Sequence, residues 1–129
     1  MGSLLRLCTD KAIDYLRNKR DKNKPFVLYL AHTMMHAIID ASPQFKGKSA
    51  GSLHGDVVEK FDYETGCLLD VLDGLSLTKN TLVIYTSDNG PWNQPAYYAK
   101  KQGHPEGSIL WGEAGPLRNG KGSFYEGNQ

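Results

Sequence analysis

Two oxygen-bearing side chains, Asp88 and Asn89, follow directly after residues 81–86, an uncharged run that is mostly β-branched or aromatic. Such a run is typical of a strand covered on both faces, as in a parallel sheet. Open α/β sheets bind ligands beyond the carboxyl ends of their strands, and a carboxylate beside an amide oxygen suits a hard cation such as Ca²⁺ or Mg²⁺. Asp88 and Asn89 are therefore a candidate cation site, and a simple turn is the other interpretation of Asp-Asn-Gly.

A second uninterrupted apolar run, residues 26–31, leads into two histidines, His32 and His36. Parallel strands end at the same edge of a sheet, so we expect these imidazoles near Asp88 and Asn89. Histidine changes its charge near neutral pH, which suits it to proton transfer.

One lysine, Lys121, lies between two glycines inside residues 92–129, a stretch rich in Gly and Pro with no helical period. Little side-chain bulk shields its ammonium group, which favours contact with a bound anion. An exposed lysine on a turn is the alternative interpretation.

Two amphipathic helices are predicted to position these residues, at 5–20 and at 55–73. Gly66 inside the second helix indicates a close packing contact. A long irregular loop, residues 37–54, precedes that helix. The order helix, strand, loop, helix, strand predicts an α/β fold with parallel strands and a right-handed crossover. The second helix has its predicted apolar face at Val57, Val58, Phe61, Leu68, Leu69 and Leu72.

Composition narrows the function classes. The 129 residues suffice for one domain, and the net charge of +1 offers no electrostatic attraction to nucleic acid or an anionic membrane. No run has the length of a membrane span, and no segment has the order of a signal peptide. The two cysteines do not make a disulfide framework.

Four motifs in order, with matching helix and strands between them, resemble the type I sulfatases, which are arylsulfatase-like enzymes of the alkaline-phosphatase superfamily. The resemblance covers nearly the whole chain, from Thr9 to Gly127. It implies an internal piece of the catalytic domain over 1–129, with a partial alkaline-phosphatase-like parallel sheet and flanking helices in 4–91 and a loop-rich active-site segment in 92–129. The motifs are His32-Thr33-Met34-Met35-His36, Gly55-Asp56-Val57-Val58-Glu59, Thr86-Ser87-Asp88-Asn89-Gly90-Pro91 and Gly120-Lys121-Gly122-Ser123-Phe124-Tyr125-Glu126-Gly127.

The resemblance implies a role for each candidate residue. Asp88 and Asn89 match calcium ligands, His36 matches a histidine that contacts the sulfate ester and assists proton transfer at the leaving oxygen, and Lys121 matches a lysine that binds sulfate. A cation, a lysine and a histidine all stabilise the charge that builds up on the leaving oxygen. The implied partner is an aryl or carbohydrate sulfate ester, and the family is found in periplasmic, secreted or lysosomal locations.

The chain also departs from the family. The family's formylglycine nucleophile arises in a Cys/Ser-x-Pro-x-Arg motif, but Cys8 has Asp10 in place of Pro and Ala12 in place of Arg, and Cys67 does not fit either. The family's other metal ligands, an Asp pair, are absent, whereas Ca²⁺ takes six to eight oxygens. Asn128 replaces a family glycine, and no Pro follows shortly after His36. We therefore expect no sulfate ester hydrolysis by this chain alone.

Two other functions fit the same residues less fully. A phosphodiesterase or phosphomutase of the superfamily needs further metal ligands, and the spare histidines His54 and His104 have no carboxylate at ligand spacing. A non-catalytic binding or assembly module fits the missing nucleophile. Two strands without neighbours would leave sheet edges open, which predicts self-association or aggregation.

Overall fold

The computed structural model describes residues 3–36, 39–92 and 112–128. The chain forms two compact units, Met1–Leu82 and Val83–Gln129, which are described separately. The first unit contains α1 (Leu4–Asp14), a π-helical turn (Tyr15–Lys19), α2 (Ser52–Gly74) and a short 3₁₀ turn (Thr78–Asn80). The second unit ends in a 3₁₀ turn, Glu126–Asn128.

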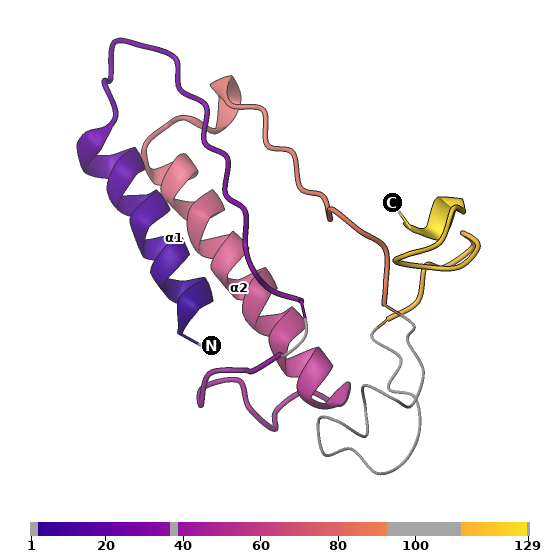
Figure 1. Cartoon of the computed structure of the whole chain (residues 1–129). Helices are drawn as coiled ribbons and strands as arrows, with labels where there is room; N and C mark the ends of the chain where they lie inside the picture. The colour runs from indigo at the N-terminus through magenta and orange to yellow at the C-terminus, as the bar shows by residue number, and fades with distance from the viewer. Residues whose placement is uncertain (1–2, 37–38, 93–111, 129) are drawn as a thin grey trace. The chain divides into compact units, whose positions relative to one another are not determined.

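The two predicted helices are confirmed, because α1 and its π-helical continuation cover most of 5–20 and α2 contains 55–73. They lie side by side and run in the same direction, while residues 26–36 return along them (Figure 1). Apolar side chains from both helices make the core, in which Leu16, Val71 and Leu72 are buried and Ile13 and Phe26 pack against them. Burial of these apolar faces stabilises helices that would be marginal in isolation.

The buried face of α2 differs from the predicted one, because it includes three charged residues spaced four apart. Asp56, Lys60 and Glu64 are each only 2% exposed, whereas Val58 and Leu69, expected in the core, are 41% and 45% exposed. Residues four apart lie on one helix face, so the predicted apolar face of α2 is partly wrong.

Asp56 is buried because its carboxylate holds the preceding loop. Its oxygens accept hydrogen bonds from the backbone N–H groups of Gly47, Lys48 and Ser49 at 2.7, 3.0 and 2.8 Å. These bonds, chiefly those from Ser49 and Gly47, lower the pKa of Asp56. The carboxylate therefore connects residues 47–49 to the first turns of α2.

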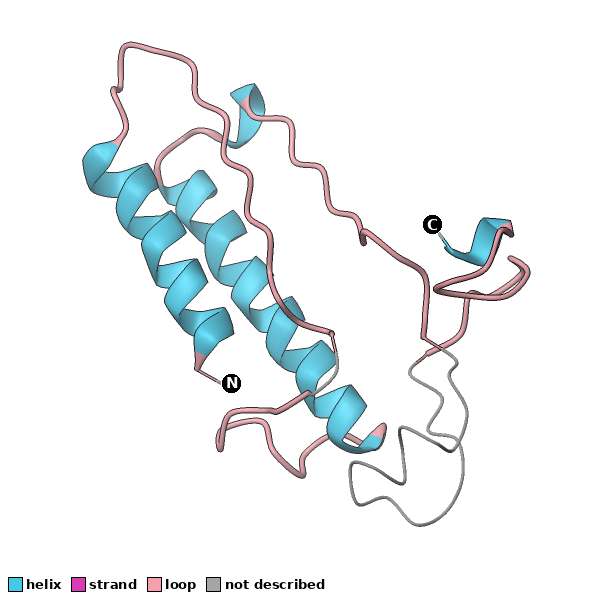
Figure 2. Ribbon diagram, viewed as in Figure 1, coloured by secondary structure: helices cyan, strands magenta, loops and turns pink. Residues whose placement is uncertain are grey.

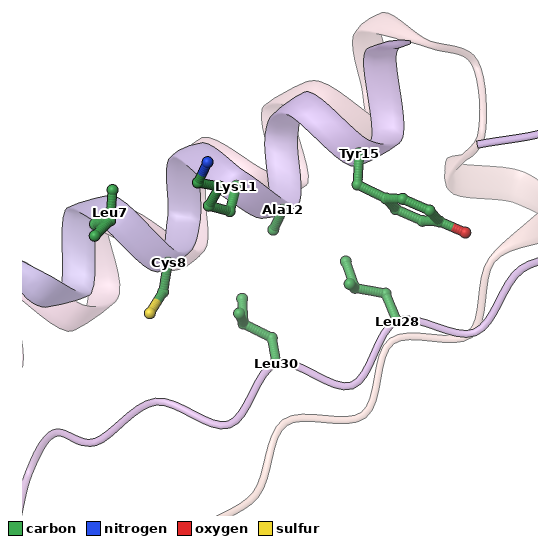
Figure 3. Close-up of a pocket in the computed structure, with 7 residues that line it drawn as sticks. All are labelled: Leu7, Cys8, Lys11, Ala12, Tyr15, Leu28 and Leu30. Carbon is green, nitrogen blue, oxygen red and sulfur yellow. The ribbon is translucent and has the colours of Figure 1, made fainter. Parts of the chain in front are cut away.

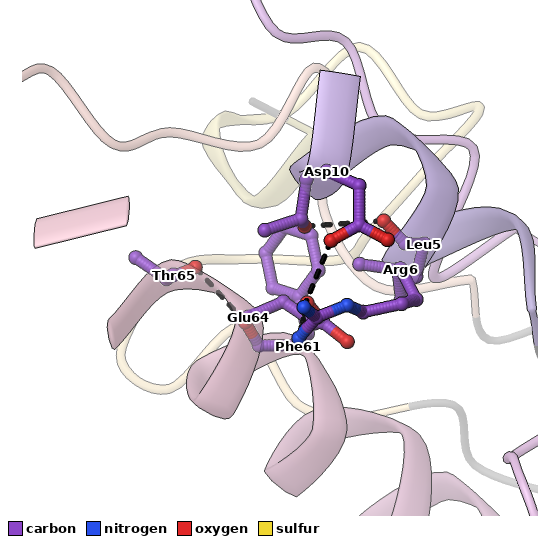
Figure 4. Close-up of polar contacts among 7 residues, drawn as sticks. Leu5, Arg6, Asp10, Phe61, Glu64 and Thr65 are labelled. Atoms are coloured by element: carbon purple, nitrogen blue, oxygen red, sulfur yellow. Dashed lines mark hydrogen bonds and ion pairs between the residues drawn. The ribbon is translucent and has the colours of Figure 1, made fainter. Parts of the chain in front are cut away.

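An ionic contact also joins the two helices (Figure 4). Arg6 lies 2.8 Å from Asp10 on its own helix and 3.7 Å from the buried Glu64 on α2, measured between the nitrogen and oxygen atoms. Arg6 thus places a positive charge beside a carboxylate that is removed from water.

The predicted parallel sheet is wrong for the described residues, which contain helices and loops but no strand (Figure 2). Residues 26–31 and 81–86 are not paired as strands with any described residue. Val27 and Leu82, which were expected inside the sheet, are 93% and 85% exposed. A strand forms only when a neighbouring strand pairs with its backbone N–H and C=O groups. A pair of strands without further strands or a helix packed on it is also only marginally stable. The apolar runs alone do not supply those neighbours.

Two further observations complete the fold. A Cβ at Gly66 would meet no atom within 4 Å, so the predicted close packing at that glycine is also wrong. Among the described residues, no helix has both the length and the apolar composition needed to cross a membrane.

Candidate functional site

The candidate cation site and the candidate anion site lie on two segments that are hydrogen-bonded to each other in the second unit. The N–H of Gly90 donates to the carbonyl of Asn128 at 2.7 Å, and the N–H of Lys121 donates to the carbonyl of Pro91 at 2.9 Å. Lys121 is thereby bonded to a residue three positions after Asp88. Although these positions are about 30 residues apart in sequence, the fold of this unit brings them together.

Glycine is required where the two segments touch. A Cβ at Gly90 would overlap the carbonyl oxygen of Gly127, and a Cβ at Gly127 would overlap the carbonyl oxygens of Asn119 and Arg118. The obstacles are backbone atoms, which cannot move aside as a flexible side chain can. Both glycines therefore allow a close backbone approach.

A tight turn presents Lys121. The N–H of Ser123 donates to the carbonyl of Gly120 at 3.1 Å, and Gly122 has a φ of 87°. A positive φ at the third position of a turn is typical of type II, in which glycine is favoured. The N–H of Gly122 also donates to the side-chain oxygen of Asn128 at 2.8 Å. The backbone of this turn is thus bonded on both sides of Lys121.

The charged end of Lys121 has no partner among the residues that the structure describes. Lys121 is partly buried, and its ammonium group has no hydrogen bond or ion pair with another described residue. Because the backbone is held and no described residue pairs with the ammonium, the turn suits the binding of an anion.

Asp88 and Asn89 offer two oxygen ligands in the same unit. Asp88 is exposed and Asn89 is partly buried, and the hydroxyl of Ser87 donates to the backbone carbonyl of Asn89 at 2.7 Å. No group of three or more His, Cys, Asp or Glu that could hold a metal occurs among the residues that the structure describes. The donor type suits Ca²⁺, but two side chains are a small part of the six to eight oxygens it takes.

A second set of contacts stiffens the end of this unit. The guanidinium of Arg118 lies over the ring of Tyr125, 3.4 Å from its centroid, and the N–H of Arg118 donates to the carboxylate of Glu126 at 3.2 Å. A cation over an aromatic face is a favourable contact. These contacts close the loop that contains Lys121.

The histidines belong to the first unit and differ in environment. The ring of His32 packs edge-on against Phe61, with 5.0 Å between centroids, and burial lowers its pKa although Glu64 acts in the opposite direction. Met34 is buried, whereas His36 is exposed and its N–H donates to the carbonyl of Thr33 at 3.3 Å. His32 therefore packs the segment onto α2 and leaves the imidazole of His36 at the surface.

Backbone hydrogen bonds join the segment that follows Asp88 and Asn89 to the segment of Lys121, while His36 lies in the separately described first unit. The family comparison then adds an independent observation, since residues 3–128 match the model of the family described as Sulfatase. The chain belongs to the sulfatase family.

Similar sulfatases come from mammals and from a bacterium. The chain is 37% identical over 126 residues to the steryl-sulfatase of Mus musculus, covering 98% of this chain and 19% of that protein. It is 36% identical over 126 residues to the N-acetylgalactosamine-6-sulfatase of Rattus norvegicus, covering 98% of this chain and 22% of that protein. It is 35% identical over 124 residues to the N-acetylgalactosamine-6-O-sulfatase of Bacteroides thetaiotaomicron, covering 93% of this chain and 22% of that protein.

The chain thus spans about a fifth of the length of these sulfatases. No solved structure matches it.

Sequence reasoning missed two residues that hold the site and its surroundings. Asn128 was noted only as a departure from the sulfatase pattern, yet it accepts hydrogen bonds from both segments. Asp56 lies outside the apolar face that was predicted for its helix, yet it is buried. A lone Asn or Asp in a polar stretch gives no sequence signal for such a role. His104, one of the spare histidines, lies outside the described residues.

Proposed function

We propose that this chain provides the sulfate-binding part of a sulfatase site that hydrolyses sulfate monoesters. Membership of the sulfatase family supports the reaction class. The observation that carries the assignment of residues is the hydrogen bond from Lys121 to Pro91, because it connects the candidate anion-binding turn to the segment with Asp88 and Asn89.

In this proposal each side chain acts on the sulfate ester through its charge. The ammonium of Lys121 binds the anionic sulfate group, and its positive charge opposes the negative charge that grows as the S–O bond breaks. The exposed imidazole of His36, when protonated, donates a proton to the leaving alcohol oxygen.

Asp88 and Asn89 would hold a calcium ion in the same site. Their oxygens fit the ligand preference of this cation, and further ligands are needed to complete the set. When bound, calcium would add positive charge near the sulfate.

The substrate class is a sulfate monoester of an aryl or carbohydrate alcohol. Two of the relatives are named a steryl-sulfatase and an N-acetylgalactosamine-6-sulfatase. Both names refer to a sulfate ester of an alcohol.

We also propose that the 129-residue chain binds sulfate without turning over the ester. Cys8 and Cys67 both lie outside a formylglycine motif, so no residue of the chain takes the nucleophile's role. Binding without turnover is therefore the expected behaviour of the isolated chain.

Sulfate binding tests the proposal directly. Isothermal titration of the chain with sodium sulfate should detect weak binding, and Lys121→Ala should weaken it about 10- to 150-fold, the range for a hydrogen bond to a charged group. Lys79→Ala is the matched control, since Lys79 is an exposed lysine in the first unit, and it should leave the affinity unchanged.

Equal sulfate affinity in Lys121→Ala and the unmodified chain would refute the assignment of Lys121. Hydrolysis of an aryl sulfate by the purified chain, abolished by His36→Ala, would refute the expected lack of turnover. Calcium titration of Asp88→Asn, compared with the unmodified chain, should show loss of any weak calcium binding.

A further inference from the structure

Residues 28–34 turn every second side chain toward the helices of the first unit. Leu28 and Leu30 point toward α1 (Figure 3). The ring of His32 packs against an aromatic ring of α2, and Met34 is buried. Residues two apart share one face of an extended segment, so these four side chains form one inward row. His32 is the member of this row that can gain a charge near neutral pH.

The imidazole of His32 lies beside a carboxylate of α2. Phe61, which its ring contacts edge-on with 5.0 Å between centroids, is three residues before Glu64 and so lies on the same helix face. The side chain of Glu64 is only 3% exposed. Nδ1 of His32 and Oε2 of Glu64 are both buried without a hydrogen-bond partner among the described residues. The packing of the ring, and not a hydrogen bond at Nδ1, therefore holds His32 in place.

Other charged groups lie beside Glu64 and set the electrostatics of this contact. Arg6 of α1 is 3.7 Å from the carboxylate, too far for a hydrogen bond, and 2.8 Å from Asp10. Lys60 is buried one turn before Glu64 on α2. Burial lowers the pKa of His32, and the negative charge of Glu64 acts in the opposite direction. Because burial is the larger effect, a proton on His32 is less favourable in the packed segment than in water.

We propose that His32 is a pH-sensitive latch: its neutral ring holds residues 32–36 on α2, acid releases them, and Glu64 limits the release. Above the unfolded pKa of about 6.5, His32 is neutral and the contact is at full strength. As the pH falls below that value, the released segment binds the proton more readily than the packed one, so the equilibrium shifts toward release. The charge of Glu64 makes the protonated ring less unfavourable in place, which keeps this shift small.

The latch also bears on His36. The N–H of His36 donates to the carbonyl of Thr33 at 3.3 Å, so both residues belong to the segment that His32 holds. In the proposed function His36 donates a proton, and the latch would then govern where that imidazole lies. This consequence rests on the proposed function, whereas the latch does not. Release is measured at Met34 and His32, so its test is independent of sulfate binding.

Two adjacent methionines report the release. Met34 is 8% exposed and Met35 is 40% exposed, so dilute hydrogen peroxide should oxidise Met35 faster while the segment is packed. Tandem mass spectrometry of the oxidised full chain gives the ratio of sulfoxide at Met34 to sulfoxide at Met35. From about pH 7 to about pH 5 this ratio should rise, up to about tenfold for each unit by which the measured pKa of His32 lies below its unfolded value. NMR titration of His32, in the folded chain and in urea, supplies both pKa values.

Three variants assign the effect. His32→Phe keeps a ring that packs on Phe61 and removes the titration, so the ratio should not depend on pH. This variant also separates His32 from His54, whose pKa is likewise lowered by burial. Glu64→Gln should leave the ratio unchanged near about pH 7, raise it further near about pH 5 and lower the pKa of His32. Glu59→Gln, at an exposed residue of the same helix, is the matched control and should behave as the unmodified chain.

Two results would overturn the latch. One is a ratio of Met34 to Met35 oxidation that is the same at both pH values, and the other is a pH dependence that persists in His32→Phe. An equal pKa of His32 in Glu64→Gln and in the unmodified chain would overturn the role of Glu64.

Discussion

Replacing Gly90 by alanine should separate the two segments that form the candidate site. The added Cβ overlaps the carbonyl of Gly127, and Gly127 cannot retreat because it is itself packed against the carbonyls of Arg118 and Asn119. The segments must therefore move apart, which breaks the hydrogen bonds from Gly90 to Asn128 and from Lys121 to Pro91.

The magnitude follows from those two bonds. Each contributes a net 0.5–1.5 kcal/mol, so losing both costs about 1–3 kcal/mol of local stability. A factor of ten corresponds to 1.4 kcal/mol, and the amide of Lys121 should exchange with solvent about 5- to 150-fold faster. Hydrogen–deuterium exchange of the Gly90→Ala variant measures this rate.

Gly66→Ala is the matched control, because a Cβ there meets no atom within 4 Å. In a helix interior alanine is more favourable than glycine by up to about 1 kcal/mol, so Gly66→Ala should make α2 more stable. Exchange at Lys121 should not change in this control. Unchanged exchange at Lys121 in Gly90→Ala would refute the close approach of the two segments.

Two further predictions concern the first unit. Val57→Ala should lower the free energy of unfolding by about 2 kcal/mol, because Val57 is completely buried. The neighbouring Val58 is 41% exposed, so Val58→Ala should change the free energy of unfolding by less than about 0.5 kcal/mol. Urea denaturation measures both values, and equal effects would contradict the described buried face of α2. Hydrogen bonds from the loop lower the pKa of Asp56, so the stability it contributes should be full above its unfolded pKa of about 4 and be lost as the pH falls through the lower folded value. Acid titration of Asp56→Asn should lack this component, and identical acid unfolding of the variant and the unmodified chain would count against the anchor.

The helices were predictable because their signal is local. Apolar residues recur at the helical period in 5–20 and 55–73, and the structure has helices at both places. The exact face of α2 was less predictable, since periodicity cannot tell that Asp56 accepts hydrogen bonds from backbone N–H groups of the preceding loop. A carboxylate with such partners is stable inside, although its type favours the surface.

The residues of the candidate site remain predictions from the sequence, and the structure adds the backbone hydrogen bonds that join two of their segments. The four motifs indicated Asp88, Asn89, His36 and Lys121 through their resemblance to the sulfatases. The match of residues 3–128 to the sulfatase family confirms that resemblance. The hydrogen bonds that join Lys121 to Pro91 and Gly90 to Asn128 had no signal in the sequence, because they connect segments about 30 residues apart.

From its sequence alone, this protein's helices and its membership of the sulfatase family can be derived, because the helices depend on short-range preferences and the family on residue types in order. Only the tertiary structure decided which side chains of α2 are buried and which backbone groups join the two segments of the candidate site, and it has no strand among the residues it describes. Burial and strand pairing depend on partners distant in the chain, and an apolar run contains no information on whether such a partner is present.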